Sequence, residues 1–308
     1  MEQVSCNLCG SRDQSRVILG RDRLMKLGDS FQVVRCRRCR LAYLNPRPTA
    51  AELSAHYPNE YNAFVRDYVH HRPRGLMKVG ADMITRRRIP RSAAAGRALE
   101  IGSGGAAYLL ALRERGWEVH GVEVSAELAQ HARETFGLDV RTGPAETQLL
   151  AFPDNHFDLV AMWHVLEHLS DPAAVLTQIR RILKPGGRLM LELPNFTGVS
   201  RFLFRTYWMA LDLPRHLYHF TPATLETMLA RAGFCDIVIR GVPAALVVTT
   251  SLQLFWNDWR GVTSARIISS RSLLVALFFG SALLARLRLS AHMAAEADKP
   301  LAAHSPRG

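Results

Sequence analysis

The sequence predicts an α/β protein built on a Rossmann-like, doubly wound sheet, with a small cysteine-bearing N-terminal segment and a helical C-terminal extension. Strand and helix signals alternate from Arg97 onward, a glycine-rich loop follows the first strand, and two cysteine pairs precede it. Such alternation is typical of a parallel sheet covered by helices. We expect four parts: residues 1–45, a linker with short helices at 46–91, the sheet domain at 92–241, and an extension at 242–308 that is helical and then disordered.

Six strands and four helices are expected in the sheet domain. The strands are short apolar runs: Arg97–Ile101, Glu118–Val124, Asp139–Arg141, Phe157–Trp163, Arg188–Leu193 and Phe234–Arg240. The helices lie between them: Ala106–Arg115, Ala126–Phe136, Pro172–Leu183 and Thr224–Ala232. No clear seventh strand is visible, because the apolar stretches after Val242 look helical.

The charge of the chain is concentrated outside the sheet domain. The 308 residues are 48% hydrophobic and 21% charged, which is normal for a globular protein with a buried core. The formal net charge is +12, and residues 1–91 carry 18 Lys and Arg against 8 Asp and Glu. Such a field attracts anionic partners, whether phosphates, nucleic acid or acidic lipid, without choosing among them. Basic side chains kept for solubility explain the same excess equally well.

The ends of the chain bear on location. No secretory signal is visible in Met1–Gly10, so a cytoplasmic location is expected. The uncharged run Leu273–Ala285 has 13 residues, fewer than the roughly 20 that a helix needs to cross a bilayer. We expect a buried or interfacial helix there, and peripheral contact of the C-terminal extension with the inner membrane surface is compatible with it.

The two cysteine pairs predict a structural zinc ribbon. Cys6 and Cys9, then Cys36 and Cys39, have the spacing of a tetrahedral four-thiolate zinc site. Zinc would stabilise a segment of about 40 residues that is too small to build a large core. Four thiolates leave no open coordination position, so this ion would not be catalytic. Cys235 lies among apolar residues, and we expect it in the core.

The glycine loop and two acidic residues predict a nucleoside site. Gly102, Gly104 and Gly105 let the backbone approach a ligand closely. Glu123 ends the second strand, where a carboxylate can accept hydrogen bonds from ribose hydroxyls. Dinucleotide-dependent dehydrogenases share these features. Glu100, just before the loop, argues against them, because it would repel a pyrophosphate but suits the cationic end of S-adenosylmethionine.

Residues 97–240 resemble the class I S-adenosylmethionine-dependent methyltransferases. The matching motifs are Leu99-Glu-Ile-Gly-Ser-Gly104, Gly121-Val-Glu-Val-Ser125, Phe157-Asp-Leu-Val160, His164-Val-Leu-Glu-His168 and Leu183-Lys-Pro-Gly-Gly-Arg188. The resemblance implies that Glu100 and the glycines hold the methionine moiety, that Glu123 binds the ribose, and that Ala145 and Glu146 lie beside the adenine. Ala106 departs from the family, which often has a glycine there. With its ribbon, the chain resembles bacterial sugar C-methyltransferases.

The motif after the fourth expected strand offers candidates for the chemistry. His164, Glu167 and His168 have spacings that place them on one helical face. The same pattern occurs as an inverted zinc-protease motif, which we reject because here it follows a strand of a nucleotide-binding series. Quinone O-methyltransferases of this class carry acids and a histidine here that bind a divalent metal; only Glu167 and His168 match them. His164 and His168 are catalytic candidates, and bracing of the loop is the alternative for the motif.

A second cluster follows the fifth expected strand, in the segment that covers the acceptor in the family. His216, Tyr218 and His219 are candidates for a base or for hydrogen bonds to the acceptor, and Arg215 for binding an acceptor anion. An equally good explanation is that the histidines fix the loop through backbone hydrogen bonds.

The leading hypothesis is an S-adenosylmethionine-dependent methyltransferase that acts on an oxygen or carbon of a small or carrier-linked metabolite, such as a saccharide, nucleotide sugar or lipid-linked intermediate. Two alternatives remain open. One is an RNA methyltransferase that uses the ribbon and basic flank on phosphates, although nucleic acid is not the favoured partner. The other is a non-enzymatic zinc-ribbon adaptor.

Overall fold

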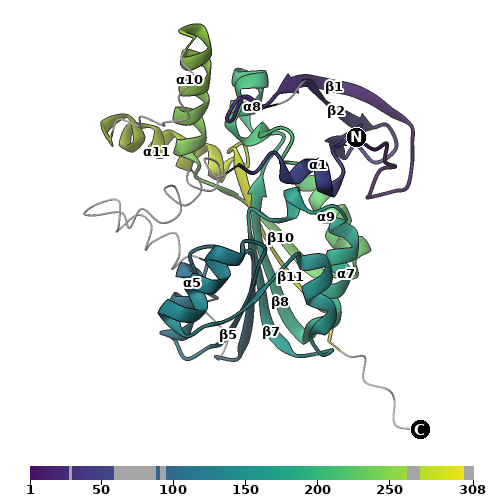
Figure 1. Cartoon of the computed structure of the whole chain (residues 1–308), viewed down its shortest axis with the longest axis vertical. Helices are drawn as coiled ribbons and strands as arrows, with labels where there is room; N and C mark the ends of the chain where they lie inside the picture. The colour runs from purple at the N-terminus through teal and green to yellow at the C-terminus, as the bar shows by residue number, and fades with distance from the viewer. Residues whose placement is uncertain (28–29, 59–87, 91–94, 262–270, 302–308) are drawn as a thin grey trace.

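The computed structural model describes residues 1–27, 30–58, 88–90, 95–261 and 271–301 (Figure 1). Most of the expected linker and the last seven residues of the expected disordered end lie outside these ranges. Seven strands form the main sheet, in the following order across it: β10 (Cys235–Val242), β11 (His292–Asp298), β8 (Leu183–Pro194), β7 (Phe157–Trp163), β4 (Arg97–Ile101), β5 (Glu118–Glu123) and β6 (Asp139–Thr142). The strands β8, β7, β4, β5 and β6 are parallel, so their carboxyl ends meet at one edge.

Helices cover both faces of this sheet, as the alternating pattern predicts. They are α4 (Ala107–Arg113), α5 (Ala126–Phe136), α6 (Ala145–Gln148), α7 (Pro172–Ile182) and α9 (Pro222–Arg231). In Figure 1, α5 lies on one side of the sheet and α7 and α9 lie on the other. Side-chain caps fix the helix starts, since Ser125 caps α5 and Asp171 caps α7. Two apolar cores result, one on each face.

The seventh strand, β11, corrects the expected boundary at residue 241. It runs antiparallel between β8 and β10, and its inward side chains Met293, Ala295 and Ala297 are buried. Alanine has a low strand propensity, which explains why this segment did not stand out as a strand. Pairing on both sides stabilises it, so residues 292–298 belong to the sheet and are not part of a disordered end.

Before β11, the described part of the C-terminal extension is largely helical, as expected. It contains α10 (Ala245–Trp259) and α11 (Arg271–Arg286), which pack on each other beside β10. Within the described ranges, no helix has the length and apolar character to cross a membrane.

The N-terminal segment shares a sheet with the segment between β8 and α9. Its strands β1 (Gln14–Arg21), β2 (Ser30–Cys36) and β3 (Ala42–Leu44) are antiparallel, and β9 (Tyr218–His219) pairs with β3. The short helix α1 (Ala50–Ser54) follows, and α8 (Val199–Phe204) lies next to α10. Buried residues of β2 and β3 join the core that α7 and α9 cover. The N-terminal segment is therefore packed against the sheet domain.

Candidate functional site

The loop after β4 passes close to the end of β7. Gly102 has a φ of +73°, and a Cβ there would lie 2.5 Å from Cγ2 of Val165. Its backbone N–H donates to the carbonyl of Val122 at 2.7 Å. Glycine at this position therefore satisfies both the turn and the close approach of two strand ends.

Glu100 is a buried carboxylate beside this loop. Its side chain is 4% exposed, and Oε2 has no hydrogen-bond partner among the described residues. Burial raises the pKa of Glu100 well above its usual value, although Arg88 acts in the opposite direction. A cationic ligand beside Glu100 would favour the ionised carboxylate.

Glu123 ties the loops after β4 and β5 together. One carboxylate oxygen accepts from Gly104 N at 2.8 Å, and the other accepts from Ser125 N at 2.9 Å. Ala145 is buried at the start of α6, while Oε1 of Glu146 accepts hydrogen bonds from Ser170. These residues lie at or just after the carboxyl ends of β4, β5 and β6, which are neighbours in the sheet.

Ala106 has the conformation that favours the glycine of the related family. It is fully buried at the N-cap of α4, with φ +59° in the left-handed region. A Cβ in that region is strained by roughly 1–2 kcal/mol. The loop after β4 keeps its left-handed turn at this position although the residue is alanine and not glycine.

His164 lies between two carboxylates directly after β7. Nδ1 is 3.4 Å from Oε1 of Glu167, and Nε2 is 3.4 Å from Oε1 of Glu192. Burial lowers the pKa of His164, but the two carboxylates outweigh it and raise the pKa to about 9. Its φ is +58°, a strained conformation of a kind that is found at functional sites.

Two residues of this region were missed by sequence reasoning. Glu192, in β8, is buried and receives hydrogen bonds from Arg88 at 2.9 and 3.2 Å. His292 begins β11, and its ring centroid lies 4.6 Å from that of His164. Glu192 is a charged residue within an otherwise apolar stretch, and this could have marked it as a candidate site residue. His292 carried none, because β11 itself was not recognised.

A second group combines Glu167, His168 and His216, whose ligand atoms lie within 4.8 Å of one another. Glu167 is 1% exposed, and neither of its carboxylate oxygens has a hydrogen-bond partner among the described residues. His168 Nδ1 lies 3.0 Å from the carbonyl of Arg215. Burial and His216 lower the pKa of His168 to about 4, so its ring is neutral at pH 7. The structure thus joins the two histidine motifs of the sequence.

The remaining candidates of the second motif lie deeper. His216 contacts the carbonyl of Ala210 through Nδ1 at 2.9 Å, and His219 stacks on Phe196. Burial lowers the pKa of His219 to about 3. The hydroxyl of Tyr218 donates to the carbonyl of Ser170 at 3.1 Å, at the contact with the N-terminal segment.

Arg215 is not placed to bind an acceptor anion, contrary to expectation. It is fully buried and forms ion pairs with Asp22 at 2.8 Å and with Asp212 at 2.7 Å. Its charge is already balanced by these two carboxylates, one of which comes from the N-terminal segment. Arg215 therefore connects that segment to the loop carrying His216.

The four N-terminal cysteines converge on one point. Their sulfur atoms lie within 4.8 Å of one another, with Cys6 and Cys39 at 3.4 Å and Cys9 and Cys36 at 3.5 Å. None of them forms a disulfide. Cys235 was expected in the core, but it is only half-buried in β10.

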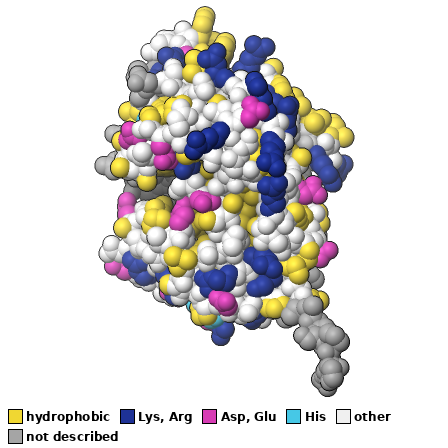
Figure 2. All heavy atoms as spheres, turned by 90° about the vertical axis from the view of Figure 1, so that its right-hand side faces the viewer, with side chains coloured by type: hydrophobic (Ala, Val, Ile, Leu, Met, Phe, Trp, Pro, Cys, Tyr) yellow, Lys and Arg dark blue, Asp and Glu magenta, His cyan; other side chains and the backbone are white. Residues whose placement is uncertain are grey.

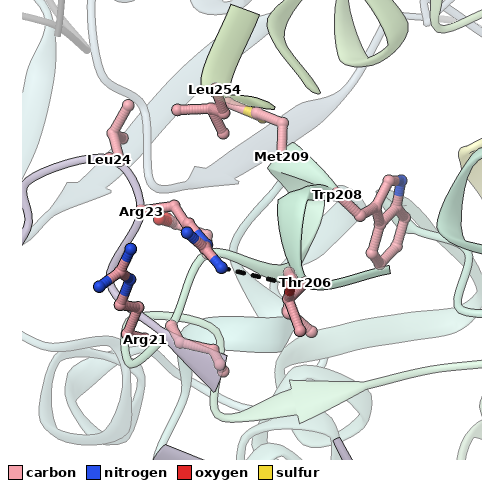
Figure 3. Close-up of a pocket in the computed structure, with 10 residues that line it drawn as sticks. Arg21, Arg23, Leu24, Thr206, Trp208, Met209 and Leu254 are labelled. Carbon is pink, nitrogen blue, oxygen red and sulfur yellow. Dashed lines mark hydrogen bonds between the residues drawn. The ribbon is translucent and has the colours of Figure 1, made fainter. Parts of the chain in front are cut away.

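A hollow lies between the end of β1 and the segment after α8 (Figure 3), and Asp212, which pairs with Arg215, is part of its lining. Arg23 points toward Thr206 across it, with Nη2 donating to Oγ1 at 3.4 Å. Asp258 pairs with both Arg21 and Arg23, so its single carboxylate offsets part of their combined positive charge. We assign no part of the donor site to this hollow.

Comparison with known proteins gives concordant results. Residues 68–237 match the methyltransferase domain family. The chain is 32% identical over 170 residues to a ubiquinone biosynthesis O-methyltransferase of Xylella fastidiosa, covering 51% of this chain and 67% of the relative. It is 32% identical over 186 residues to a demethylmenaquinone methyltransferase of Thermus thermophilus, covering 52% and 84%.

Solved structures agree on the fold. An S-adenosylmethionine-dependent methyltransferase from Archaeoglobus fulgidus superimposes with a TM-score of 0.54 at 22% identity. The match covers 78% of this chain and 100% of that one.

Proposed function

Since this chain belongs to the methyltransferase domain family and is an S-adenosylmethionine-dependent methyltransferase, we propose that it methylates a hydroxyl oxygen of a small, lipid-linked acceptor at the ends of β7 and β8. The observation that carries this proposal is the proximity of His164, Glu167 and His168: His164 lies 3.4 Å from Glu167, and Glu167 clusters with His168. Val165, between them in the chain, lies next to Gly102 of the glycine loop. Several titratable groups next to a donor loop suit proton transfer during methyl transfer.

One feature of the structure supports the binding of S-adenosylmethionine at the glycine loop. S-adenosylmethionine supplies an electrophilic methyl group on a positively charged sulfur. We propose that Glu100, whose buried Oε2 has no partner among the described residues, binds the cationic methionine end. Glu123 would accept the ribose hydroxyls with its remaining lone pairs, and Ala145 and Glu146 would border the adenine. The loop glycines would allow the backbone to approach the ligand.

On the acceptor side, the chain holds and deprotonates the hydroxyl. His164 and His168 keep part of their surface open to solvent, whereas His216 and His219 are buried behind them. With Nδ1–H of His168 donating to the Arg215 carbonyl, Nε2 is left as an acceptor for the hydroxyl proton. His216 packs edge-on against His168 and orients its ring. We assign Tyr218 and His219 positioning roles rather than contact with the acceptor.

The choice of acceptor class is supported by the relatives. Two of them are named for steps on quinones, one at an oxygen. This chain shares only part of its length with them, and its ribbon and helical extension lie outside the matched family domain. A hydroxylated, lipid-linked small molecule therefore remains the proposal rather than a particular quinone.

Transfer of a labelled methyl group tests this function. Purified protein, labelled S-adenosylmethionine and lipid extracts from cells lacking the protein should give a labelled product that resists mild base, as an ether does and an ester does not. His168→Asn should reduce the rate by roughly 100-fold or more without changing donor affinity. His131→Asn, on the outer face of α5, is the matched control. Label appearing only in RNA, or an unchanged rate in His168→Asn, would contradict the proposal.

The cysteine cluster fits a structural zinc ion. Zinc–sulfur bonds of about 2.3 Å place tetrahedral sulfurs roughly 3.8 Å apart, close to the separations of 3.4 and 3.5 Å in the structure. We propose that Cys6, Cys9, Cys36 and Cys39 hold this ion. It would stabilise the small sheet in which β3 pairs with β9.

An anionic lipid surface is the partner we propose for the projecting helices. Phe255, Trp256 and Trp259 of α10 are at least half exposed, and so are Phe202 and Leu203 of the neighbouring α8. Arg201 and Arg260 lie over aromatic rings of these helices. In Figure 2, further Lys and Arg side chains run along the upper part of the face that carries the ribbon. Aromatic rings flanked by cations suit a negatively charged membrane interface.

Vesicle binding checks this contact. The protein should sediment with vesicles containing phosphatidylglycerol, and Trp256→Ser with Trp259→Ser should reduce that binding. Leu150→Ser, an exposed apolar residue of the sheet domain, is the matched control. Equal binding by all three proteins would rule out this surface.

A further inference from the structure

We propose that His164, Glu192 and His292 form a binding site for a divalent transition-metal ion at the acceptor side of the sheet edge. The three residues come from the ends of β7, β8 and β11, and their ligand atoms lie within 4.8 Å of one another. None of the cysteines belongs to this site. The existence of this metal site is independent of the proposed function, whereas the role of the metal in catalysis rests on that function.

The distances suit a shared ion better than direct hydrogen bonds. Oε1 of Glu192 lies 3.4 Å from Nε2 of His164 and 3.7 Å from Nδ1 of His292. Hydrogen bonds between such groups usually measure about 2.7–3.2 Å. Ligands bound at about 2.0–2.2 Å to one ion lie roughly 3–3.6 Å from each other, so the first separation falls in this range and the second lies just above it.

The surrounding residues orient these ligands as they do in known metal sites. Arg88 binds Oε2 of Glu192, which leaves Oε1 directed at both histidines. A metal-bound histidine commonly directs its other ring nitrogen to a carboxylate. Nδ1 of His164 has Glu167 in that position, at 3.4 Å.

Glu167 supplies an independent indication of a ligand. Its side chain is 1% exposed and both carboxylate oxygens lack a hydrogen-bond partner in the described part of the chain. Oε1 lies 3.4 Å from Nδ1 of His164, and burying a carboxylate is costly unless a nearby positive charge compensates it. An ion on Nε2 of His164 would keep a positive charge next to Glu167 when the imidazole itself is neutral.

The donor set indicates which ions would bind and what they would do. Two imidazoles and one carboxylate suit Mn²⁺, Fe²⁺ or Zn²⁺ and leave coordination positions open. His164 is 35% exposed, so one side of the site is accessible. A hydroxyl oxygen of the acceptor can occupy an open position there, where the ion would lower its pKa. A weak base such as His168 would then suffice to take the proton.

Titration with Mn²⁺ tests the site in the full-length protein. Mn²⁺ favours nitrogen and oxygen ligands over thiolates, so the cysteine cluster does not compete for it. The loss of the free-ion signal in electron paramagnetic resonance should show about one bound Mn²⁺ per chain. His292→Ala and His164→Asn should each weaken this binding by at least about 10-fold. Asparagine is chosen at 164 because it tolerates the left-handed backbone.

Matched controls separate a lost site from a lost fold. His120→Ala removes a histidine of β5 that pairs with Asp139 outside the cluster, and it should bind Mn²⁺ as the wild type does. Calorimetry with S-adenosylmethionine should show unchanged donor binding in His292→Ala and His164→Asn. A variant that binds neither Mn²⁺ nor S-adenosylmethionine is misfolded. If His292→Ala fails to fold, His164→Asn decides whether the metal site exists.

Several results would overturn the proposal. One is the absence of Mn²⁺ binding in the wild type, and another is equal Mn²⁺ affinity in the wild type and the variants. A third is loss of Mn²⁺ binding in Glu167→Gln with full binding in His164→Asn and His292→Ala. That result would place the ion at Glu167, His168 and His216. Methyl transfer that persists without bound metal refutes only the catalytic role of the ion. Metal binding without any methyl transfer refutes the proposed function and leaves the site intact.

Discussion

The two halves of the sheet edge are assembled in different ways. The half that we propose for the methyl donor, called the donor half, uses the ends of β4, β5 and β6, where Glu100, Glu123 and Ala145 follow each other within one stretch of the chain. The acceptor half brings His164 of β7 together with Glu192 of β8 and His292 of β11, backed by the loop of Arg215 and His216. Local motifs build the first half, and long-range packing builds the second. The two halves should therefore respond differently to the same kind of change.

Loss of the proposed zinc ion should separate the donor and acceptor halves most strongly. Cys36→Ser should abolish the binding of zinc, whose contribution to folding in small zinc domains is about 10–16 kcal/mol. Because β3 pairs with β9, the acceptor loop should lose its support and methyl transfer should disappear. Donor binding, measured by calorimetry, should persist. Cys235→Ser is the control. Equal loss of donor binding and methyl transfer in Cys36→Ser would show that the two halves are not independent.

The buried ion pairs of Arg215 should give the next largest effect. Arg215→Met leaves the carboxylates of Asp22 and Asp212 buried without their cation. The free energy of unfolding should fall by about 3–5 kcal/mol in urea titrations. Arg240→Met, which removes a surface pair with Glu296, should cost about 1 kcal/mol or less. Similar losses in both variants would contradict the assigned role of Arg215.

Glu100→Gln should lower donor affinity and raise the stability of the unliganded protein. Losing a charged hydrogen bond to the ligand should weaken binding by roughly 10- to 100-fold in calorimetry. Burial raises the folded-state pKa of Glu100 above its unfolded value of 4.5. Folding then takes up a proton, so stability is fullest below pH 4.5 and falls as pH rises toward the folded-state pKa.

Glutamine does not titrate, so the melting temperature of Glu100→Gln should exceed that of the wild type at pH 8, and the difference should shrink at pH 5. A constant difference across this range would show that ionisation of Glu100 is not its cause.

Ala106→Gly should produce the smallest effect, confined to the donor half. Removing a Cβ from φ +59° should relieve strain, and we expect about 0.5–1 kcal/mol of added stability in urea titrations. Ala111→Gly, inside α4, should destabilise by about 1 kcal/mol. Destabilisation by both variants would mean that the loop is not strained at Ala106.

Much of the donor half could be predicted from the sequence. Its glycines and acids lie next to strands that the alternating pattern locates, and parallel strands bring their carboxyl ends to one edge. In the same way, the spacing of the cysteines predicted that the four N-terminal sulfur atoms lie together. These features are local, so a few residues of chain determine their geometry.

The sequence by itself therefore determined the fold class, the position of the glycine loop and the clustering of the four N-terminal cysteines, because each depends on neighbours along the chain. Only the tertiary structure decided the acceptor half. The insertion of β11 placed His292 beside His164, and burial turned Arg215 from an expected anion ligand into an internal ion pair. Such contacts join residues 100 or more positions apart, and no local propensity reports which partner a buried charge will meet.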